Sequence, residues 1–211
     1  MQYINKRIQQ EICYKTLKKL TDEKLINEYK KCKSVKNEIQ KLDNVLRNYI
    51  DEKTKEKIIE NYLLHLIPAG TKGVIRGNKF NNIVNQFVKK LSLDEDRFKI
   101  CFEKNCNYHF TTEIPDWYIL EKLTNKTLIG MNQLDLWGGG HQLNRGSKYI
   151  VDNKYNNNNN NKNNKLLCVV CNEIQFKSKK NKAYKIFETG FGNNTLCYLN
   201  NLHNIITLHF K

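Results

Sequence analysis

The chain has 211 residues, with 36 Lys and Arg against 21 Asp and Glu, and a formal charge of +15. No apolar run approaches the roughly 20 residues that a membrane-spanning helix needs, and the N-terminus lacks the apolar stretch of a secretory signal. We therefore expect an intracellular protein, cytoplasmic or nuclear, that is not secreted, does not bind membranes and has a nucleic acid as its partner. A lysine-rich composition inherited from an AT-rich genome is the alternative explanation of the charge.

The first part of the chain, residues 1–67, is predicted to be a helical arm. Apolar residues recur at helical spacing in two stretches, from Val35 to Tyr49 and from Ile58 to Leu66. We expect the arm to be a packing element, with a DNA clamp or the contact surface of a homodimer as the functional alternatives.

A glycine-rich basic loop is expected next, at residues 70–77. It does not fit the phosphate-binding loop of nucleotide hydrolases, because no Gly-Lys-Ser or Gly-Lys-Thr follows at the required offset. Basic side chains on a surface loop attract phosphates, so Lys72 and Arg76 are candidate DNA contacts.

The remainder, residues 68–211, is predicted to be an α/β core. Apolar spacing indicates a helix from Phe80 to Leu91, then strands at 98–102, 112–120 and 127–137, with a turn at 124–126 between the last two. A helix at 141–151, an Asn-rich loop at 152–165, a strand at 166–174, a strand or helix at 184–187 and an amphipathic tail at 196–210 follow. The expected order after the arm is helix, strand, strand, strand, helix, strand.

A carboxylate between apolar residues of a strand is costly unless it binds a cation or accepts hydrogen bonds, and Asp116 is in such a place. Residues two apart on a strand share a face, so Gln133 and Asp135 point the same way on the next strand. If the two strands pair through the tight turn, these side chains converge with Asp116 on one metal ion. Oxygen ligands of this kind suit Mg²⁺, which activates water and neutralises charge at a phosphate.

Pro115-Asp116 on one hairpin strand, with Gln133-Leu134-Asp135 on the next, resembles the PD-(D/E)XK nuclease superfamily of restriction endonucleases. The resemblance covers roughly residues 76 to 175 and rests mainly on the order of elements. It implies a restriction-endonuclease-like core, a mixed sheet flanked by helices, that hydrolyses double-stranded DNA with Mg²⁺. Asp116 and Asp135 would then hold the metal, and Gln133 would be an auxiliary ligand or would position water.

This sequence departs from the family pattern at the second motif. The family has an acid followed two residues later by Lys, whereas Gln133 and Asp135 stand at those places here. The resemblance then implies a basic group from the following helix, where Lys148 and Arg145 are the candidates, with Lys148 placed near the attacking water. The predicted first helix also lacks the Glu that some members of the family use.

The segment from Gly138 to Tyr149 is dense in hydrogen-bond donors. Its three consecutive glycines let the backbone approach a phosphate, and its Gln142, Asn144 and Arg145 are residue types that read base edges. We expect these three side chains to contact DNA, and an ordinary solvated helix after a glycine turn is the alternative.

Seven cysteines offer a rival hypothesis of a zinc site. Cys168 and Cys171 have metal-ligand spacing, and Cys101 with Cys106 or His109 would complete four ligands. The alternative is that the thiols are reduced core residues of a strand. The function expected from the sequence is thus a Mg²⁺-dependent endonuclease, with a zinc-stabilised or catalytically inactive nucleic-acid-binding protein as the alternative.

Overall fold

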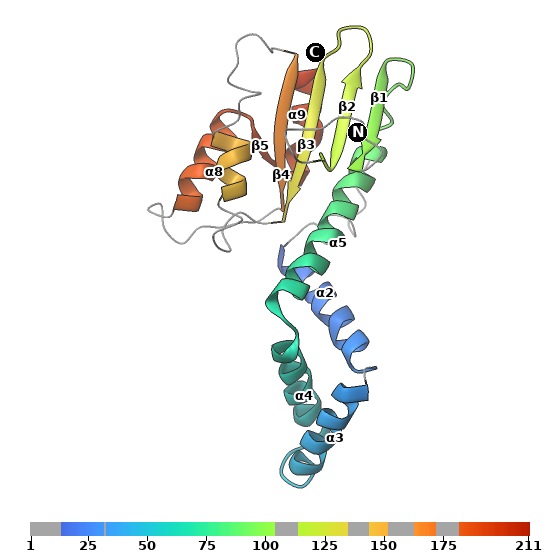
Figure 1. Ribbon diagram of the computed structural model, residues 1–211, viewed down its shortest axis with the longest axis vertical. Coiled ribbons are helices and arrows are strands. Elements are labelled where there is room, and N and C mark those ends of the chain that lie inside the picture. The colour runs from blue at the N-terminus through green and yellow to red at the C-terminus, as the bar shows by residue number, and fades with distance from the viewer. Residues whose placement is uncertain (1–13, 32, 104–113, 135–143, 152–162, 172–181) are drawn as a thin grey trace. The chain divides into compact units, whose positions relative to one another are not determined.

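The structure is a computed structural model that describes residues 14–31, 33–103, 114–134, 144–151, 163–171 and 182–211 (Figure 1). The chain divides into two compact units, with Lys15–Lys79 in one and Phe80–Lys211 in the other, so the division falls inside one long helix, α5 (Ala69–Lys89). Among the described helices, none is long and apolar enough to span a bilayer.

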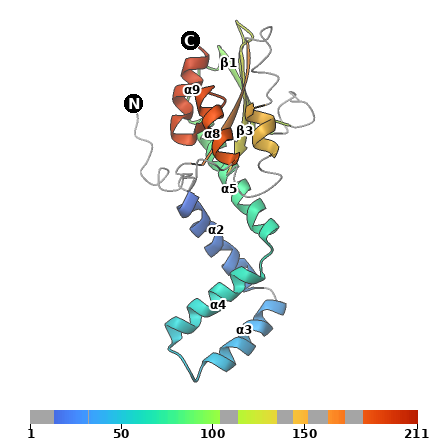
Figure 2. The same cartoon turned by 90° about the vertical axis from the view of Figure 1, so that its left-hand side faces the viewer.

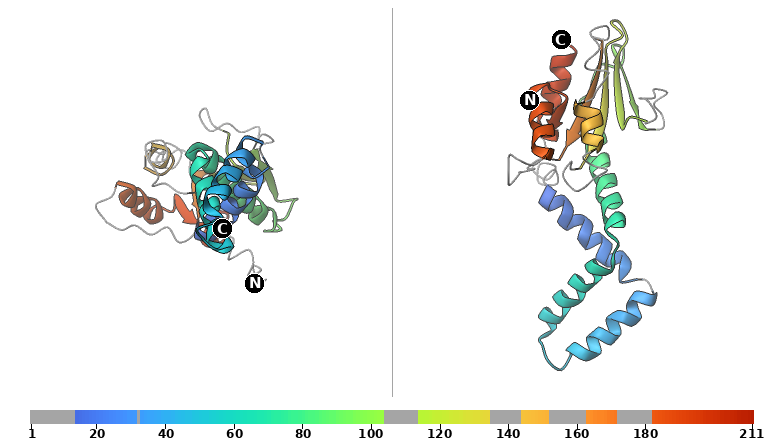
Figure 3. Two further views of the ribbon diagram at one scale, coloured as in Figure 1. Left: turned by 90° about the horizontal axis from the view of Figure 1, so that it is seen from below. Right: turned by 60° about the vertical axis from the view of Figure 1, so that its left-hand side comes forward.

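The helical unit contains α2 (Tyr14–Tyr29), α3 (Lys33–Leu46), α4 (Glu52–Leu66) and the first half of α5. Consecutive helices α3 and α4 lie side by side (Figure 3). The core of the unit consists of Ile26 of α2 with Ile59 and Leu63 of α4, against which Ile39 of α3 and other partly buried apolar residues pack. Asp51 caps α4 by accepting the backbone N–H of Thr54 at 3.0 Å. The described residues of the predicted arm therefore form three helices joined by short turns.

The predicted loop at 70–77 is wrong, because these residues are the first turns of α5. Pro68 precedes the helix, and its carbonyl accepts the N–H of Lys72 at 3.1 Å. Proline interrupts a helix interior but suits a helix start, where no backbone N–H is needed. Each glycine inside a helix lowers the stability of the helix by about 1 kcal/mol relative to alanine. This cost is too small to end α5, because the same helix continues into a segment whose Phe80 and Val84 side chains are buried.

The second unit is built on a mixed five-stranded sheet with the strand order β1-β2-β3-β4-β5. Strands β1 and β2 and strands β2 and β3 pair antiparallel, whereas β3 with β4 and β4 with β5 pair parallel. The bounds are β1 (Phe98–Phe102), β2 (Trp117–Glu121), β3 (Thr127–Gln133), β4 (Asn164–Val170) and β5 (Leu196–Tyr198). Every residue of β3 is buried, as expected of a central strand covered on both faces.

The helices of this unit are η2 (Ser147–Val151), α8 (Lys182–Gly192) and α9 (Leu202–His209), the last preceded by a short turn, η3 (Leu199–Asn201). Residues of η2 and α8 share one core cluster with Tyr118 of β2 and Ile129 of β3. On the other face, the Phe98 and Phe210 rings meet edge to face at 5.1 Å, so the end of α9 covers that side. Figure 2 shows η2 and α9 on opposite sides of the sheet.

The predicted order of helix, strand, strand, strand, helix, strand is confirmed, and the unit is a mixed α/β fold. The bounds of several elements needed correction. Residues 114–116 precede β2, Leu134 follows β3 and Cys171 follows β4, although all were predicted to lie within these strands. Strand β4 begins at Asn164, within the predicted Asn-rich loop; residues 184–187 belong to the helix α8; and the tail contains β5 before α9. Residues 152–162 of the predicted loop lie outside the described part of the chain.

Candidate functional site

Asp116 is held by polar groups from two elements of the sheet unit. It lies at a bend just before β2, after the buried Pro115. Its backbone N–H donates to the carbonyl of Gly130 at 3.0 Å, which continues the β2–β3 ladder by one residue. Its Oδ2 accepts the backbone N–H of Asn132 at 2.6 Å, and its Oδ1 accepts Nδ2 of Asn81 at 2.9 Å. The carboxylate is thus held between the end of β3 and the second half of α5.

The electrostatic environment makes the ionised form of Asp116 costly. Burial, and to a lesser degree the nearby Glu103 carboxylate, raises the pKa of Asp116 from its ordinary 3.8, and the net value is about 6. The Asn132 N–H, the Asn81 amide and the Arg145 guanidinium oppose that rise without cancelling it. A carboxylate in such a position is suited to accept a cation or a proton.

Glu103 is a site residue that the sequence analysis missed. It follows β1 directly, and its backbone N–H donates to the carbonyl of Asp116 at 3.1 Å. Its φ of 46° is left-handed, a conformation that costs about 1–2 kcal/mol for a residue with a Cβ. Oε1 lies 3.5 Å from Nδ2 of Asn85, one helical turn after Asn81 on α5. Only the β1–β2 register brings Glu103 beside Asp116, so no local sequence pattern marks it as a site residue.

Asn132 is the residue of β3 that meets Asp116. Its side chain lies on the face of the sheet occupied by Trp117, whose Nε1–H donates to Asn132 Oδ1 at 3.0 Å. Gly130 leaves room for that indole, because a Cβ on this glycine would overlap the Trp117 ring. With Oδ1 occupied, Nδ2 of Asn132 is a buried donor that finds no acceptor among the described residues, and the side chain is only 7% exposed.

Of the residues that the sequence placed at a metal site, the structure describes Asp116 and Gln133. Gln133 is buried at the end of β3. Strand alternation places it on the face opposite that of Asn132, and no described contact joins it to Asp116. Asp135 lies outside the described residues, so its convergence with Asp116 stays a prediction.

The predicted DNA contacts that follow β3 are partly described. Arg145 and Asn144 are exposed, and the Arg145 charge acts on Asp116. The Lys148 ammonium lies 5.7 Å from the centre of the Tyr149 ring, in η2, and its proposed place beside the attacking water stays a prediction. Gln142 lies outside the described residues.

Lys72 and Arg76, also predicted to bind DNA, are in the helical unit. Lys72 Nζ donates to the carbonyl of Leu64, in the last turn of α4, at 2.9 Å. Arg76 Nη2 lies 2.6 Å from Asp22 Oδ1, with both side chains 16% exposed. These internal contacts give both residues a structural role, and their contact with DNA stays a prediction.

The cysteines predicted to bind zinc are described in part. Cys168 is fully buried in the core cluster of β2, β3, η2 and α8, and Cys101 packs against that cluster. Burial raises the pKa of Cys168 well above its ordinary value, which opposes the thiolate that zinc needs. Cys171 is buried beyond β4, and Cys106 and His109 lie outside the described residues. Within the described ranges, no three His, Cys, Asp or Glu side chains group as metal ligands.

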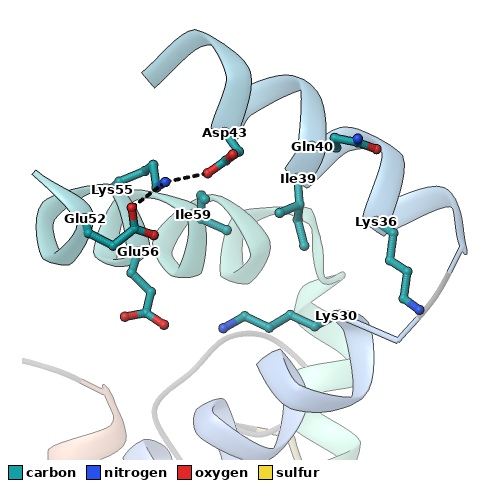
Figure 4. Close-up of a pocket in the computed structure, with 9 residues that line it drawn as sticks. All are labelled: Lys30, Lys36, Ile39, Gln40, Asp43, Glu52, Lys55, Glu56 and Ile59. Atoms are coloured by element: carbon teal, nitrogen blue, oxygen red, sulfur yellow. Dashed lines mark ion pairs between the residues drawn. The ribbon is translucent and has the colours of Figure 1, made fainter. Parts of the chain in front are cut away.

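A pocket of about 430 Å³ lies within the helical unit (Figure 4). Its apolar residues are Ile39 and Ile59, which belong to the core of that unit. At one end, Lys55 Nζ is shared between Asp43 Oδ1 at 2.7 Å and Glu52 Oε2 at 2.6 Å. The charges on its wall are thus largely neutralised by one another, so the pocket shows no preference for one kind of ligand.

Comparisons of the chain with family models, with curated proteins and with solved structures found no match.

Proposed function

We propose that this protein is a Mg²⁺-dependent endonuclease that hydrolyses phosphodiester bonds of double-stranded DNA, and that its sheet unit is a restriction-endonuclease-like core. The observation that carries the proposal is the carboxylate of Asp116. It is placed before the second strand of a helix–strand–strand–strand–helix–strand order, its pKa is raised to about 6, and it lies close to Glu103 and Arg145.

The residues present fit a magnesium ion. Mg²⁺ in phosphoryl-transfer sites takes one or two carboxylates and completes its octahedron with water and phosphate oxygens. Asp116 provides one carboxylate, and Asp135, which lies outside the described residues, is a further candidate from its spacing in the sequence. Gln133 lies on the opposite face of the sheet from Asn132, so it is not a ligand in this proposal. When bound, the cation would lower the pKa of a water molecule and neutralise charge on the scissile phosphate.

The chain's own residues have separate roles in this proposal. Asn132 and Asn81 hold the two oxygens of the Asp116 carboxylate in a fixed orientation. Arg145 is exposed beside that carboxylate, where its guanidinium can bind a phosphate oxygen. Lys148 is proposed as the basic group that handles the proton of the attacking water. The excess positive charge of the chain would supply most of the affinity for DNA, independent of its sequence.

Nicking of a supercoiled plasmid tests the proposal. The protein should convert the plasmid to open-circular and linear forms with Mg²⁺ and not with EDTA, and Asp116→Asn should abolish the conversion. Glu188→Gln is the matched control, since Glu188 is an exposed carboxylate on α8. If the purified protein binds the plasmid but never cuts it, the catalytically inactive nucleic-acid-binding alternative replaces the nuclease. The homodimer expected from the sequence stays a prediction.

A further inference from the structure

Two carboxylates on neighbouring strand ends face one small region of the sheet unit. The backbone N–H of Glu103 donates to the carbonyl of Asp116, so their Cα atoms are neighbours across β1 and β2, one step beyond the pair Phe102 and Trp117. The left-handed φ of Glu103 turns the chain there, at the point where the β1–β2 ladder ends. Like charges so placed repel each other unless a cation or a proton lies between them.

The second half of α5 supports both carboxylates from one helical face. Asn81 and Asn85 are four residues apart, and residues at this spacing are neighbours on a helix surface. Asn81 Nδ2 donates to Asp116 Oδ1 at 2.9 Å, and Asn85 Nδ2 lies 3.5 Å from Glu103 Oε1. Each carboxylate therefore keeps one oxygen that α5 does not use.

Two amide side chains beside this pair, that of the buried Asn132 and that of the half-buried Asn85, each have one covered atom without a partner among the described residues. One is the donor Nδ2 of Asn132, whose side chain is 7% exposed and whose own backbone N–H binds Asp116. The other is the acceptor Oδ1 of Asn85, on the same amide that approaches Glu103. Buried polar atoms are nearly always hydrogen-bonded. An unpartnered donor on the residue that binds Asp116 and an unpartnered acceptor on the residue that approaches Glu103 therefore indicate a ligand that offers both.

We propose that Glu103 is the second carboxylate of a divalent-cation site formed with Asp116, and that the bound cation is hydrated and carries a phosphate oxygen of the nucleic acid. A water on the cation donates to Asn85 Oδ1, because cation-bound water is a strong donor. The phosphate oxygen accepts Nδ2–H of Asn132. The charges of this arrangement balance. The two carboxylates and one phosphodiester are negative, and the Arg145 guanidinium and the divalent cation neutralise them.

Strand register explains why Asn132 belongs to this site. Trp117 pairs with Gly130, and side chains of paired antiparallel residues share a face. Asn132 is two residues beyond Gly130, so it lies on the Trp117 face, which α5 and α9 cover. Asp116 lies at a bend and not within the strand, so strand alternation does not decide the side of its carboxylate. The hydrogen bond from Asn81 of α5 places the carboxylate on the same side as Asn132.

The assignment of the phosphate rests on the proposed nuclease function, but cation binding can be measured with no nucleic acid present. The experiment titrates Mn²⁺ into the full-length protein at about pH 8, where Asp116 is ionised, and follows free Mn²⁺ by electron paramagnetic resonance. Mg²⁺ is then added as a competitor. The variants are Glu103→Gln and Asp116→Asn, with Glu188→Gln as the control for loss of an exposed carboxylate, and circular dichroism checks that each variant is folded.

We expect one site in the wild-type protein that Mg²⁺ empties. Glu103→Gln should weaken Mn²⁺ binding by about tenfold or more, Asp116→Asn should remove it, and Glu188→Gln should leave it unchanged. Equal affinity in Glu103→Gln and wild type would overturn the role of Glu103, whatever the nicking assay shows. Absence of any site in the wild type would overturn the inference as a whole. A protein that binds Mn²⁺ through Glu103 and yet cuts no plasmid would retain the cation site and lose the nuclease function.

Discussion

The backbone N–H of Asn132 donates to Oδ2 of Asp116 at 2.6 Å, and this bond joins the end of β3 to the bend before β2. It binds the carboxylate at the place where the two strands stop pairing. A second bond from the same residue, between its Oδ1 and the indole N–H of Trp117, fixes the amide. Asn132 therefore holds both the Asp116 carboxylate and the Trp117 indole in place.

Asp116 should make the stability of the fold depend on pH. Because burial raises its pKa to about 6, the folded state binds this proton more tightly than the unfolded state does. Protonated Asp116 therefore stabilises the folded state fully below pH 3.8, and this stabilisation is lost as the pH rises through about 6. The loss lowers the free energy of unfolding by about 3 kcal/mol in total. Asp116→Asn removes the charge while its oxygen can still accept the Asn132 N–H.

Without divalent cations, we therefore expect Asp116→Asn to unfold at a higher denaturant concentration than wild type above pH 6, and the difference to vanish near pH 4. Chemical denaturation across this range measures it, with Glu188→Gln as the control. A variant that is less stable than wild type at all pH values would show that the ionised carboxylate contributes more through its hydrogen bonds than burial costs.

Gly130 should tolerate no side chain. A Cβ at this position would overlap the ring of Trp117, which is fully buried and cannot move aside. We expect Gly130→Ala to lower the free energy of unfolding by about 3 kcal/mol or more, by overpacking. Gly73→Ala is the matched control: it lies in α5 with open space around it, and it should raise stability by up to about 1 kcal/mol. Equal effects in the two variants would contradict the packing of the indole on Gly130.

Asp116 could be found from the sequence because a carboxylate in an apolar strand is conspicuous. Glu103 could not, since its proximity to Asp116 comes from the β1–β2 register and its side chain is exposed like that of an ordinary surface glutamate. The choice between Asn132 and Gln133 was also beyond the sequence. Asn132 and Gln133 are adjacent, so they face opposite sides of the sheet. Asp116 lies at a bend, so the alternation of side chains along its strand does not tell which of the two residues it meets.

The order of helices and strands along the chain was predictable because β2, β3 and β4 are runs of buried, mostly apolar residues separated by clear turn signals. The turn after β2 was found, and Asn125 adopts the positive φ of 55° that asparagine tolerates. The start of α5 was missed because Pro68 and three nearby glycines resemble a loop. Long-range contacts such as the Arg76–Asp22 ion pair, which hold that helix in the helical unit, leave no local pattern.

DNA binding should depend steeply on salt, as expected from a charge of +15. If Arg145 contacts one phosphate, Arg145→Ala should weaken binding similarly for unrelated duplexes and reduce the slope of log K against log salt by about one. Lys185→Ala removes the same charge from an exposed position on α8 and should change the slope less. Fluorescence anisotropy of labelled duplexes over a salt series gives both slopes. Identical slopes for the two variants would remove Arg145 from the DNA contact.

Lys55 should be important for the helical unit. Its side chain is 8% exposed, and its ammonium lies within 2.7 Å of Asp43 and 2.6 Å of Glu52. The Lys55 hydrogen bond lowers the pKa of Asp43, so this contact stabilises the fold above the ordinary pKa of 3.8 and is lost as the pH falls through the lower folded value. Lys55→Ala should lower the melting temperature at neutral pH and lessen the loss of stability in acid. Lys53→Ala, on the exposed side of α4, is the control.

The Asn132 amide has two roles: its Oδ1 accepts the Trp117 indole N–H, and its Nδ2 is proposed to donate to the phosphate. Asn132→Asp should separate them. Asn132→Asp keeps an oxygen for the Trp117 indole N–H and replaces the unpaired Nδ2 donor by a second oxygen. A third carboxylate beside Asp116 and Glu103 should strengthen Mn²⁺ binding, because charge adds to cation affinity. It should also raise the pKa of Asp116 further, so that the apo variant is less stable than wild type near neutral pH and regains stability when the cation is added. The phosphate, however, loses its donor and meets a negative charge, so DNA affinity and plasmid nicking should both fall. Mn²⁺ titration, thermal melting with and without Mg²⁺, and the nicking assay measure the three effects on one variant. If cation affinity and nicking change in the same direction, Asn132 does not contact the phosphate.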